Sequence, residues 1–324
     1  MFKMSHPLLS IQGLKTYFTD REPPVKAVDG VDLELTPGEA VGLVGESGCG
    51  KTMLALSIGQ LLPPGARIVS GEIRLRGEAL HRLEGKRLTA IRGGKLAYIF
   101  QDPMTALNPV LSIGRQLVET IQLHQRKNGA EADRLGIRLL ERVQIPMPDR
   151  RFRQFPHQLS GGMRQRVMIA IALAGNPSLL IADEPTTALD VTTQAEILTL
   201  IKQLQRELEM AVLLITHDLA TVAPVSDRIA VMYAGRIVEI AQSSTFYKNP
   251  SHPYTQALLH CLPKVGQGRQ PFQSIPGTVP DLSATPPGCP FHPRCPEVLN
   301  RCQTDEPELQ PLSSNHTVRC WARC

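Results

Sequence analysis

The sequence GESGCGKT, at residues 45–52, restricts the possible folds of this chain more than any other stretch. It matches the pattern G-x-x-x-x-G-K-[ST], in which glycines let the backbone turn tightly and point its N–H groups at phosphate oxygens. An apolar run at 40–44 precedes it, and a helix is expected from about residue 50. Strand, loop and helix in this order predict a phosphate-binding loop made by Gly45, Glu46, Ser47, Gly48, Cys49, Gly50, Lys51 and Thr52.

The last residues of this loop indicate a nucleoside triphosphate with a metal ion. Lys51 would place a positive charge on the β- and γ-phosphates, and the hydroxyl of Thr52 is a ligand for Mg²⁺. Cys49 is interpreted as a small loop residue that offers its N–H group, with oxidant sensing by its thiol as the alternative. We therefore predict a nucleoside triphosphate and Mg²⁺ as cofactors.

A second motif, LLIADEP at 179–185, predicts hydrolysis of that nucleotide. Its apolar residues form a buried strand that ends at Asp183, whose carboxylate would reach Mg²⁺ through water. Glu184 follows directly and would orient or deprotonate the attacking water. The pair could be an ordinary turn by itself, but the phosphate loop makes catalysis the better interpretation.

Strands and helices alternate along most of the chain. Strands are expected at 8–18, 27–36, 40–44, 72–76, 96–100, 178–183, 211–216 and 228–233, and the stretch 110–155 is helical and polar. This order predicts an α/β fold with a largely parallel sheet. After about residue 249 regular periodicity fades, and 13 of the 27 prolines fall between Pro250 and Pro311. We expect an irregular tail there, held by something other than a large core.

Composition limits the partners. The net charge of +5 over 324 residues permits contact with an anionic membrane surface but is too weak and scattered to predict a nucleic-acid partner. The start of the chain lacks the pattern of a signal peptide, and no apolar run approaches the roughly 20 residues of a membrane span. We therefore expect a reducing compartment, where clustered cysteines favour metal binding over disulfides.

Five motifs together resemble the ATP-binding-cassette (ABC) ATPases over about residues 8–260. They are GESGCGKT, LSGGMRQR at 159–166, LLIADEP, TALD at 187–190 and LLITHD at 213–218, in the order and spacing of that family. The resemblance implies a P-loop NTPase with a RecA-like core, an antiparallel β subdomain and a helical subdomain at about 103–158. The ATPase domain would cover 1–262, and a small irregular extension rich in cysteine and proline would cover 263–324.

The resemblance also implies roles for single residues. Gln101 resembles the glutamine that senses Mg²⁺ and the transport partner, and His217 resembles the histidine that contacts the γ-phosphate and supports Glu184. Phe18 resembles the aromatic residue that stacks on adenine, with Tyr17 as a rival. The Mg²⁺ ligands would be Thr52, Gln101 and Asp183.

Pairing of two cassettes is implied as well. In this family the signature of one cassette caps the ATP held by the other, and Ser160, Gly161 and Gly162 would offer a hydroxyl and helix-start N–H groups to a γ-phosphate. Asp190 resembles the acidic residue that bridges the two ATP sites. The partner would be a second ABC ATPase subunit, expected to be a different paralogous chain.

Narrower motifs resemble the dipeptide and oligopeptide importers, a group that includes nickel-type members. They are FQDPMTALNP at 100–109, PHQLSGGMRQRVMIAIAL at 156–173 and NPSHPYTQALL at 249–259. The resemblance implies a peripheral subunit on the cytoplasmic face of the cell membrane, two transmembrane permease chains and an extracytoplasmic peptide-binding protein. The cargo stays open between dipeptides, longer peptides, peptide-like metabolites, haem and metal chelates.

The tail carries four cysteines, Cys289, Cys295, Cys302 and Cys320, that could hold a metal. Four thiolates bind Zn²⁺ or an iron–sulfur cluster, and their wide spacing counts against zinc. Some peptide-importer subunits carry a [4Fe–4S] cluster on this motif, so the resemblance implies a cluster, with Zn²⁺ or unligated thiols as alternatives. Cys261 and Cys324 do not fit this set.

Two other function classes compete with transport. A soluble cassette ATPase of translation or DNA repair would have two cassettes in one chain or a long coiled coil, and neither is visible. A redox- or metal-sensing regulator would give the tail the main role. Co-purification with permease chains would favour transport over both.

Overall fold

The computed structural model describes residues 7–102, 106–187, 189–262 and 274–323. These residues form two compact units. Unit 1 takes its described residues from Met1–Leu8, Thr36–Ala40 and Arg82–Ile215, and unit 2 takes them from Leu9–Leu35, Val41–His81 and Thr216–Cys324. The predicted start of the helical subdomain, residue 103, and the predicted start of the extension, residue 263, lie outside the described residues.

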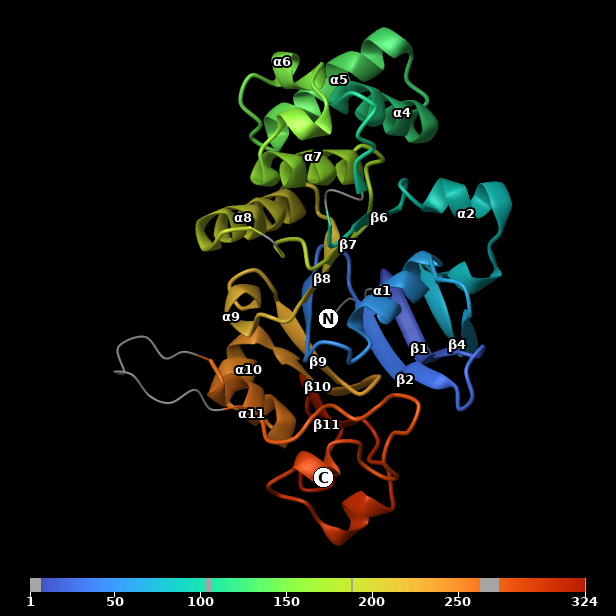
Figure 1. The fold of residues 1–324 in the computed structure, drawn as a ribbon, viewed down its shortest axis with the longest axis vertical. Helices are drawn as coiled ribbons and strands as arrows, with labels where there is room; N and C mark the ends of the chain where they lie inside the picture. The colour runs from blue at the N-terminus through green and yellow to red at the C-terminus, as the bar shows by residue number, and fades with distance from the viewer. Residues whose placement is uncertain (1–6, 103–105, 188, 263–273, 324) are drawn as a thin grey trace, which may run out of the picture. The chain divides into compact units, whose positions relative to one another are not determined.

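Unit 2 contains the predicted antiparallel sheet, drawn in blue to blue-green in Figure 1. Its strand order is β2-β1-β4-β5, with β1 at Leu9–Phe18, β2 at Val25–Leu35, β4 at Ala66–Leu75 and β5 at Glu78–Ala79. Alternate apolar residues face the core because side chains alternate along a strand. Leu9 and Leu35, for example, are register partners and fully buried. Strand β4 begins six residues before the expected 72, within a stretch that is mostly exposed.

Five further strands of unit 2 pair in the order β3-β9-β10-β12-β11. Parallel β3 (Ala40–Val44) and β9 (Arg228–Tyr233) are buried apolar runs, as expected for strands covered on both faces. Antiparallel β10 (Arg236–Gln242), β12 (His316–Val318) and β11 (Gln310–Ser313) extend the sheet. The helices of this unit are α1 (Lys51–Gly59), α9 (Leu219–Val222), α10 (Ser243–Lys248) and α11 (Pro253–His260).

The described part of the C-terminal tail has more regular structure than its proline content predicts. It contributes β11, β12 and two short 3₁₀ helices, η3 (His292–Arg294) and η4 (Asn300–Gln303), and Figure 1 draws this part in red. Phe291 of the tail is 1 % exposed and packs on the rings of Tyr233 and Tyr254, with centroids 5.2 and 5.3 Å away. The tail therefore shares the core of unit 2, which corrects the expectation that something other than a core holds it.

A buried carboxylate also ties the tail to the sheet. Glu239 on β10 is 0 % exposed and accepts hydrogen bonds from the backbone N–H groups of Ser251 and His252, both at 2.8 Å. Its remaining contact is a 2.7 Å hydrogen bond with Nε2 of His316 on β12. Because a buried charge needs such partners, Glu239 fixes the start of α11 and the register of β12 together.

His252 makes the stability of unit 2 depend on pH. Its buried ring accepts a hydrogen bond from the N–H group of Tyr254, and burial lowers the pKa of His252 from 6.5 to about 3, with Arg323 acting in the same direction. Between these values the unfolded chain binds a proton that the folded chain does not. The contribution of His252 to the free energy of unfolding should therefore be complete above pH 6.5 and should be lost as the pH is lowered toward 3.

The variant His252→Asn tests this expectation. Asparagine keeps a side-chain oxygen for the helix cap but does not titrate, so urea unfolding of the variant should lose less stability between pH 6.5 and pH 4 than wild type. Substitution of the exposed His157 by asparagine serves as the matched control. Equal slopes of stability against pH in wild type and His252→Asn would contradict the assignment.

Unit 1 combines parallel strands with the predicted helical insert. Its strand order is β8-β7-β6, with β6 at Leu96–Ile99, β7 at Leu179–Asp183 and β8 at Ala211–Thr216. The helices are α2 (Gly85–Ile91), α4 (Ile113–Gln125), α5 (Gly129–Arg142), α6 (Pro148–Phe152), α7 (Gly161–Leu173) and α8 (Val191–Glu207), with 3₁₀ turns η1 (Leu80–Arg82) and η2 (Pro156–Gln158).

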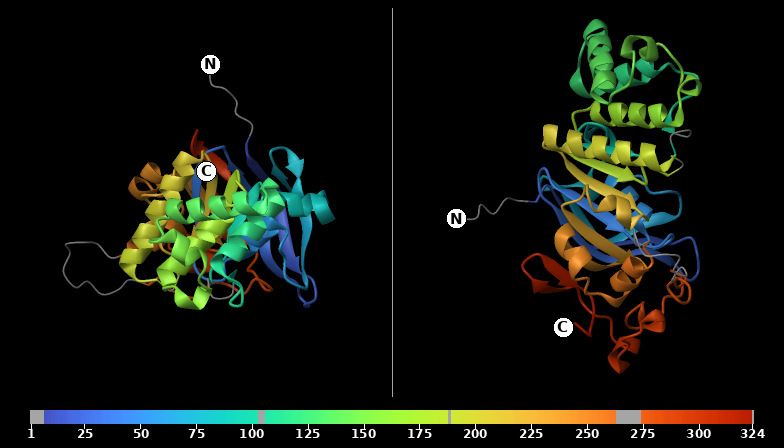
Figure 2. Two further views of the ribbon diagram at one scale, coloured as in Figure 1. Left: turned by 90° about the horizontal axis from the view of Figure 1, so that it is seen from above. Right: turned by 90° about the vertical axis from the view of Figure 1, so that its left-hand side faces the viewer.

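Small residues let the insert close on an aromatic ring. A Cβ atom at Gly114 of α4 or Gly136 of α5 would lie 2.4 or 2.7 Å from the ring of Phe152, so only glycine admits this ring between the helices. Figure 2 shows α4, α5 and α6 gathered next to α7. Within the part of the chain that the structure describes, no helix is both long and apolar enough to cross a membrane.

Candidate nucleotide-binding site

The phosphate loop lies in unit 2, between β3 and α1. A Cβ atom at Gly45 would lie 2.2 Å from the carbonyl oxygen of Met232, and one at Gly50 would lie 2.1 Å from that of Ala27. Both glycines also have positive φ angles, of 155° and 107°, which disfavour side chains. The loop is therefore a backbone cradle that requires glycine at both positions.

Lys51 is held inside this cradle. Its ammonium group is buried and donates hydrogen bonds of 2.8 and 2.9 Å to the carbonyl oxygens of Gly45 and Glu46. Cys49 is fully buried beside it, and burial raises the pKa of the Cys49 thiol although the neighbouring Lys51 acts in the opposite direction. A neutral buried thiol reacts poorly with oxidants, which favours the structural interpretation of Cys49.

The predicted aromatic pair separates into two roles. The hydroxyl of Tyr17 donates a 2.5 Å hydrogen bond to Asp29, and burial together with this bond raises the pKa of Tyr17. Its neighbour Phe18 ends β1 half-buried, with the guanidinium of Arg21 5.9 Å from its ring centre. The stacking of Phe18 on adenine stays a prediction.

His217 also belongs to unit 2, in the exposed turn directly after β8. The following residue, Asp218, fixes that turn: its N–H group donates to the hydroxyl of Thr216 at 3.0 Å, and its side chain caps α9 through the N–H group of Ala220 at 2.8 Å.

The acidic motif lies in unit 1, at the end of β7. Asp183 is 3 % exposed and accepts a 2.8 Å hydrogen bond from the hydroxyl of Tyr98 on β6. Glu184 follows with a φ angle of 46°, uncommon for a residue with a side chain, and its N–H group donates to the carbonyl oxygen of Ile215 at 2.9 Å. This backbone conformation turns the chain immediately after the strand.

Two groups orient the carboxylate of Glu184. Gln101 donates from Nε2 to Oε2 of Glu184 at 3.0 Å, and the hydroxyl of Thr187 donates to the same oxygen at 2.8 Å. The structure thus brings together two predicted residues 83 positions apart in the sequence. Tyr98 and Thr187 were not predicted, although Tyr98 lies three residues before Gln101 in YIFQDP and Thr187 begins TALD.

The signature motif begins α7 in the predicted manner. Ser160 is the N-cap residue, and its hydroxyl accepts a 3.3 Å hydrogen bond from the N–H group of Met163. Ser160 and Gly161 are exposed, and Gly162 is half-buried, where a Cβ atom would meet Thr193 of α8 at 2.9 Å. The helix start therefore presents a hydroxyl and backbone N–H groups, the arrangement that attracts anions.

Asp190 has a structural role in unit 1. It caps α8 by accepting hydrogen bonds from the N–H group of Thr193 at 3.0 Å and from its hydroxyl at 2.8 Å. These bonds lower the pKa of Asp190, which is therefore ionised at neutral pH.

The predicted [4Fe–4S] site at Cys289, Cys295, Cys302 and Cys320 is wrong. Across residues 7–102, 106–187, 189–262 and 274–323, no group of three or more His, Cys, Asp or Glu side chains is placed to hold a metal ion. The zinc alternative fails for the same reason, and Cys324 lies outside the described residues.

Burial keeps these thiols neutral in the structure. It raises the pKa of Cys289 to about 11 and also raises the pKa values of Cys295 and Cys320. The N–H group of Cys289 donates to the carbonyl oxygen of Cys302 at 2.8 Å, so backbone contacts hold the segment. The cysteines act here as small apolar side chains.

Comparisons with known proteins identify the family. A family model described as "ABC transporter" matches residues 28–187, and one described as "Oligopeptide/dipeptide transporter, C-terminal region" matches residues 238–302. The dipeptide transport ATP-binding protein DppD of Bacillus subtilis is 48 % identical, and the alignment covers 97 % of this chain and 94 % of that protein. DppD of Escherichia coli is 45 % identical, with coverage of 97 % and 96 %.

Solved structures agree with the fold. The dimeric ATP-binding cassette MJ0796, bound to ADP and Pi, is 29 % identical and matches with a TM-score of 0.65, covering 72 % of this chain and 98 % of that chain. The predicted α/β fold of the ABC ATPase type is thereby confirmed. With relatives this similar over nearly the whole chain, the protein belongs to the family of ATP-binding subunits of ABC transporters, in the dipeptide and oligopeptide branch.

Proposed function

We propose that this protein is the ATP-hydrolysing subunit of an importer of dipeptides or short oligopeptides. The observation that carries the proposal is the 48 % identity with a dipeptide transport ATP-binding protein over 97 % of the chain. The glycine cradle around Lys51 and the oriented carboxylate of Glu184 supply the chemistry that such a subunit needs.

Residues 45–52 bind the triphosphate of ATP in this proposal. Backbone N–H groups of the loop, from Gly45 to Gly50, and the ammonium group of Lys51 offset phosphate charge, and the ring of Phe18 stacks on adenine. Thr52, Gln101 and Asp183 would hold Mg²⁺, which would supply positive charge next to the phosphates.

Glu184 is the proposed general base, and Gln101 and His217 support it. A general base must keep its carboxylate oriented toward the proton that it accepts, and the hydrogen bonds from Gln101 and Thr187 restrict the rotation of Glu184. His217 would contact the γ-phosphate and assist Glu184. Lys51 completes the proposed catalytic set.

A second, similar cassette would complete each ATP site. Ser160, Gly161 and Gly162 would cap the γ-phosphate held by the partner, and Asp190 would bridge the two sites. ATP then joins the two cassettes and hydrolysis releases them, a change between two states controlled by the ligand. The exposure of Ser160 and Gly161 at the start of α7 supports this role.

The subunit would act at the cytoplasmic face of the cell membrane, docked on two permease chains and supplied by an extracytoplasmic binding protein. We also propose the domain division that the sequence predicts: an ATPase domain at 1–262 and an extension at 263–324. The binding protein and permeases would select the cargo.

Reconstitution of the transporter tests the function and the cargo together. The complex, purified with its permeases and placed in proteoliposomes, should hydrolyse ATP faster when the binding protein carries a dipeptide. Stimulation by a nickel chelate or haem, and not by peptides, would reject peptide import in favour of another cargo. A chain that does not co-purify with permeases would contradict transport altogether.

A further inference from the structure

One residue of the C-terminal extension touches the phosphate loop. Arg294, in η3, makes a two-pronged contact with the carboxylate of Glu46: Nη1 lies 2.8 Å from Oε2, and Nη2 lies 3.1 Å from Oε1. The two residues are 248 positions apart, and both belong to unit 2. Two parallel charge-assisted hydrogen bonds fix the orientation as well as the position of a carboxylate.

Backbone groups of the extension hold Arg294 in place. The side chain of Arg294 is only 4 % exposed, and it donates to the carbonyl oxygen of Pro276 at 2.8 Å and to that of Ile275 at 3.3 Å. Its guanidinium also lies 5.8 Å from the ring centre of Tyr233. Burial alone lowers the pKa of Arg294, but its bonds to Glu46 and Tyr233 outweigh burial and raise it. The residue is therefore a fixed cation.

Glu46 is held on its other sides as well. Its N–H group donates to the hydroxyl of Tyr254 at 2.9 Å, and its carbonyl oxygen accepts the bond from Lys51. Glu46 thus links the triphosphate cradle to two residues outside the motif, Tyr254 on α11 and Arg294 in the extension. Without Arg294, the loop would also carry an unpaired negative charge next to the position proposed for an anionic triphosphate.

We propose that Arg294 is a positioning residue for ATP binding: it neutralises and orients Glu46, so the C-terminal extension sets the affinity of the phosphate loop. The inference rests on the proposed function only in assigning ATP to residues 45–52. It adds a role for the extension in the ATPase itself, beyond any role in docking or cargo choice.

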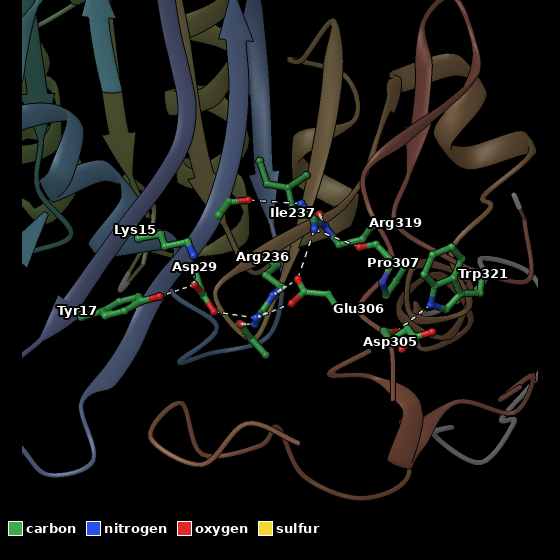
Figure 3. Close-up of polar contacts among 12 residues, drawn as sticks. Lys15, Tyr17, Asp29, Arg236, Ile237, Asp305, Glu306, Pro307, Arg319 and Trp321 are labelled. Atoms are coloured by element: carbon green, nitrogen blue, oxygen red, sulfur yellow. Dashed lines mark hydrogen bonds and ion pairs between the residues drawn. The ribbon is translucent and has the colours of Figure 1, made fainter. Parts of the chain in front are cut away.

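The extension has a second, independent attachment, which makes the inference testable. Figure 3 shows Glu306 of the extension in contact with Arg236 of β10, which also binds Asp29 of β2 at 2.7 Å, and with Arg319 at 3.4 Å. Loss of the Arg294–Glu46 contact therefore leaves the extension anchored, and effects on ATP binding can be separated from loss of the fold.

The test measures the affinity for Mg-ATP in the full-length chain within its complex. Arg294→Gln should raise the Kd for ATP about tenfold, the loss expected for one charged hydrogen-bonded contact. The KM for ATP should rise in parallel, while kcat at saturating ATP stays within about threefold of wild type. Arg294→Lys keeps the charge but not the paired geometry and should give an intermediate Kd.

Arg301→Gln is the matched control. Arg301 lies in the same extension, is 58 % exposed and pairs with Asp305 at 3.3 Å, so its loss changes the net charge equally without touching the loop. Its Kd for ATP should equal that of wild type. The double variant Glu46→Gln/Arg294→Gln should bind ATP more tightly than Arg294→Gln, because it removes the charge that Arg294 neutralises.

Three outcomes would overturn the inference. They are an unchanged Kd in Arg294→Gln, an equal loss of affinity in Arg301→Gln, and a double variant no better than Arg294→Gln. Hydrogen exchange of residues 45–52 should be faster in Arg294→Gln, and the melting temperature confirms that each variant is folded. Failure of wild type itself to bind ATP would instead refute the proposed function.

Discussion

The variant Glu184→Gln binds ATP as wild type does and hydrolyses it at least about 100 times more slowly, the range expected for loss of a general base. Glutamine has nearly the same shape, and its side-chain oxygen still accepts hydrogen bonds from Gln101 and Thr187. The amide does not accept the proton of the attacking water. The measurement is phosphate release by the assembled complex, together with the Kd for Mg-ATP.

A matched substitution separates this effect from a general loss of charge. Glu207 lies at the end of α8, where its carboxylate is 40 % exposed and 3.7 Å from Arg142. The variant Glu207→Gln should leave both ATP hydrolysis and ATP binding unchanged. Hydrolysis by Glu184→Gln at the wild-type rate in the assembled complex would refute the role of Glu184.

The variant Arg236→Met lowers the free energy of unfolding by about 3 kcal/mol, the cost of removing one partner from a buried ion pair. The side chains of Arg236 and Asp29 are 10 % and 7 % exposed, and Arg236 also contacts Glu306 (Figure 3). Methionine fills much of the same volume but leaves Asp29 with contacts only from Tyr17 and the more distant Lys15 among those drawn. Urea unfolding of the full chain measures the loss.

Two comparisons sharpen this prediction. Arg74→Met removes an exposed pair with Glu72 and should cost less than about 1 kcal/mol. The double variant Arg236→Met/Asp29→Asn removes both charges, so it should be more stable than Arg236→Met alone. If Arg236→Met and Arg74→Met destabilise the chain equally, the buried network of Figure 3 contributes little to folding.

Local patterns in the sequence predict the elements that carry them. The apolar run at 40–44 and the alternation in 8–18 correspond to β3 and β1, because burial on one or both faces leaves a period in the sequence. The first half of β4 is largely exposed and leaves no such period, and α2 is short and polar. Strands β11 and β12 have only four and three residues, so their pairing depends on contacts distant in sequence.

Functional residues are likewise predictable only where a local pattern contains them. The motifs identify Lys51, Asp183 and Glu184 because the chemistry of these residues requires fixed spacing along the chain. Arg294 escapes such reasoning because its partner is 248 positions away. The cysteine spacing led to the wrong prediction of a metal site because spacing along the chain specifies neither the directions of the thiols nor their burial.

The last two strands of the chain, β11 and β12, cover an edge of the sheet that would otherwise be exposed. Strand β12 pairs with β10 along Glu239–Ala241, and β11 covers β12 in turn. A chain shortened to the length of a bare cassette would present the N–H and C=O groups of β10 as an open sheet edge, which invites pairing with other molecules. Removal of the extension should therefore favour aggregation, in addition to weakening ATP binding.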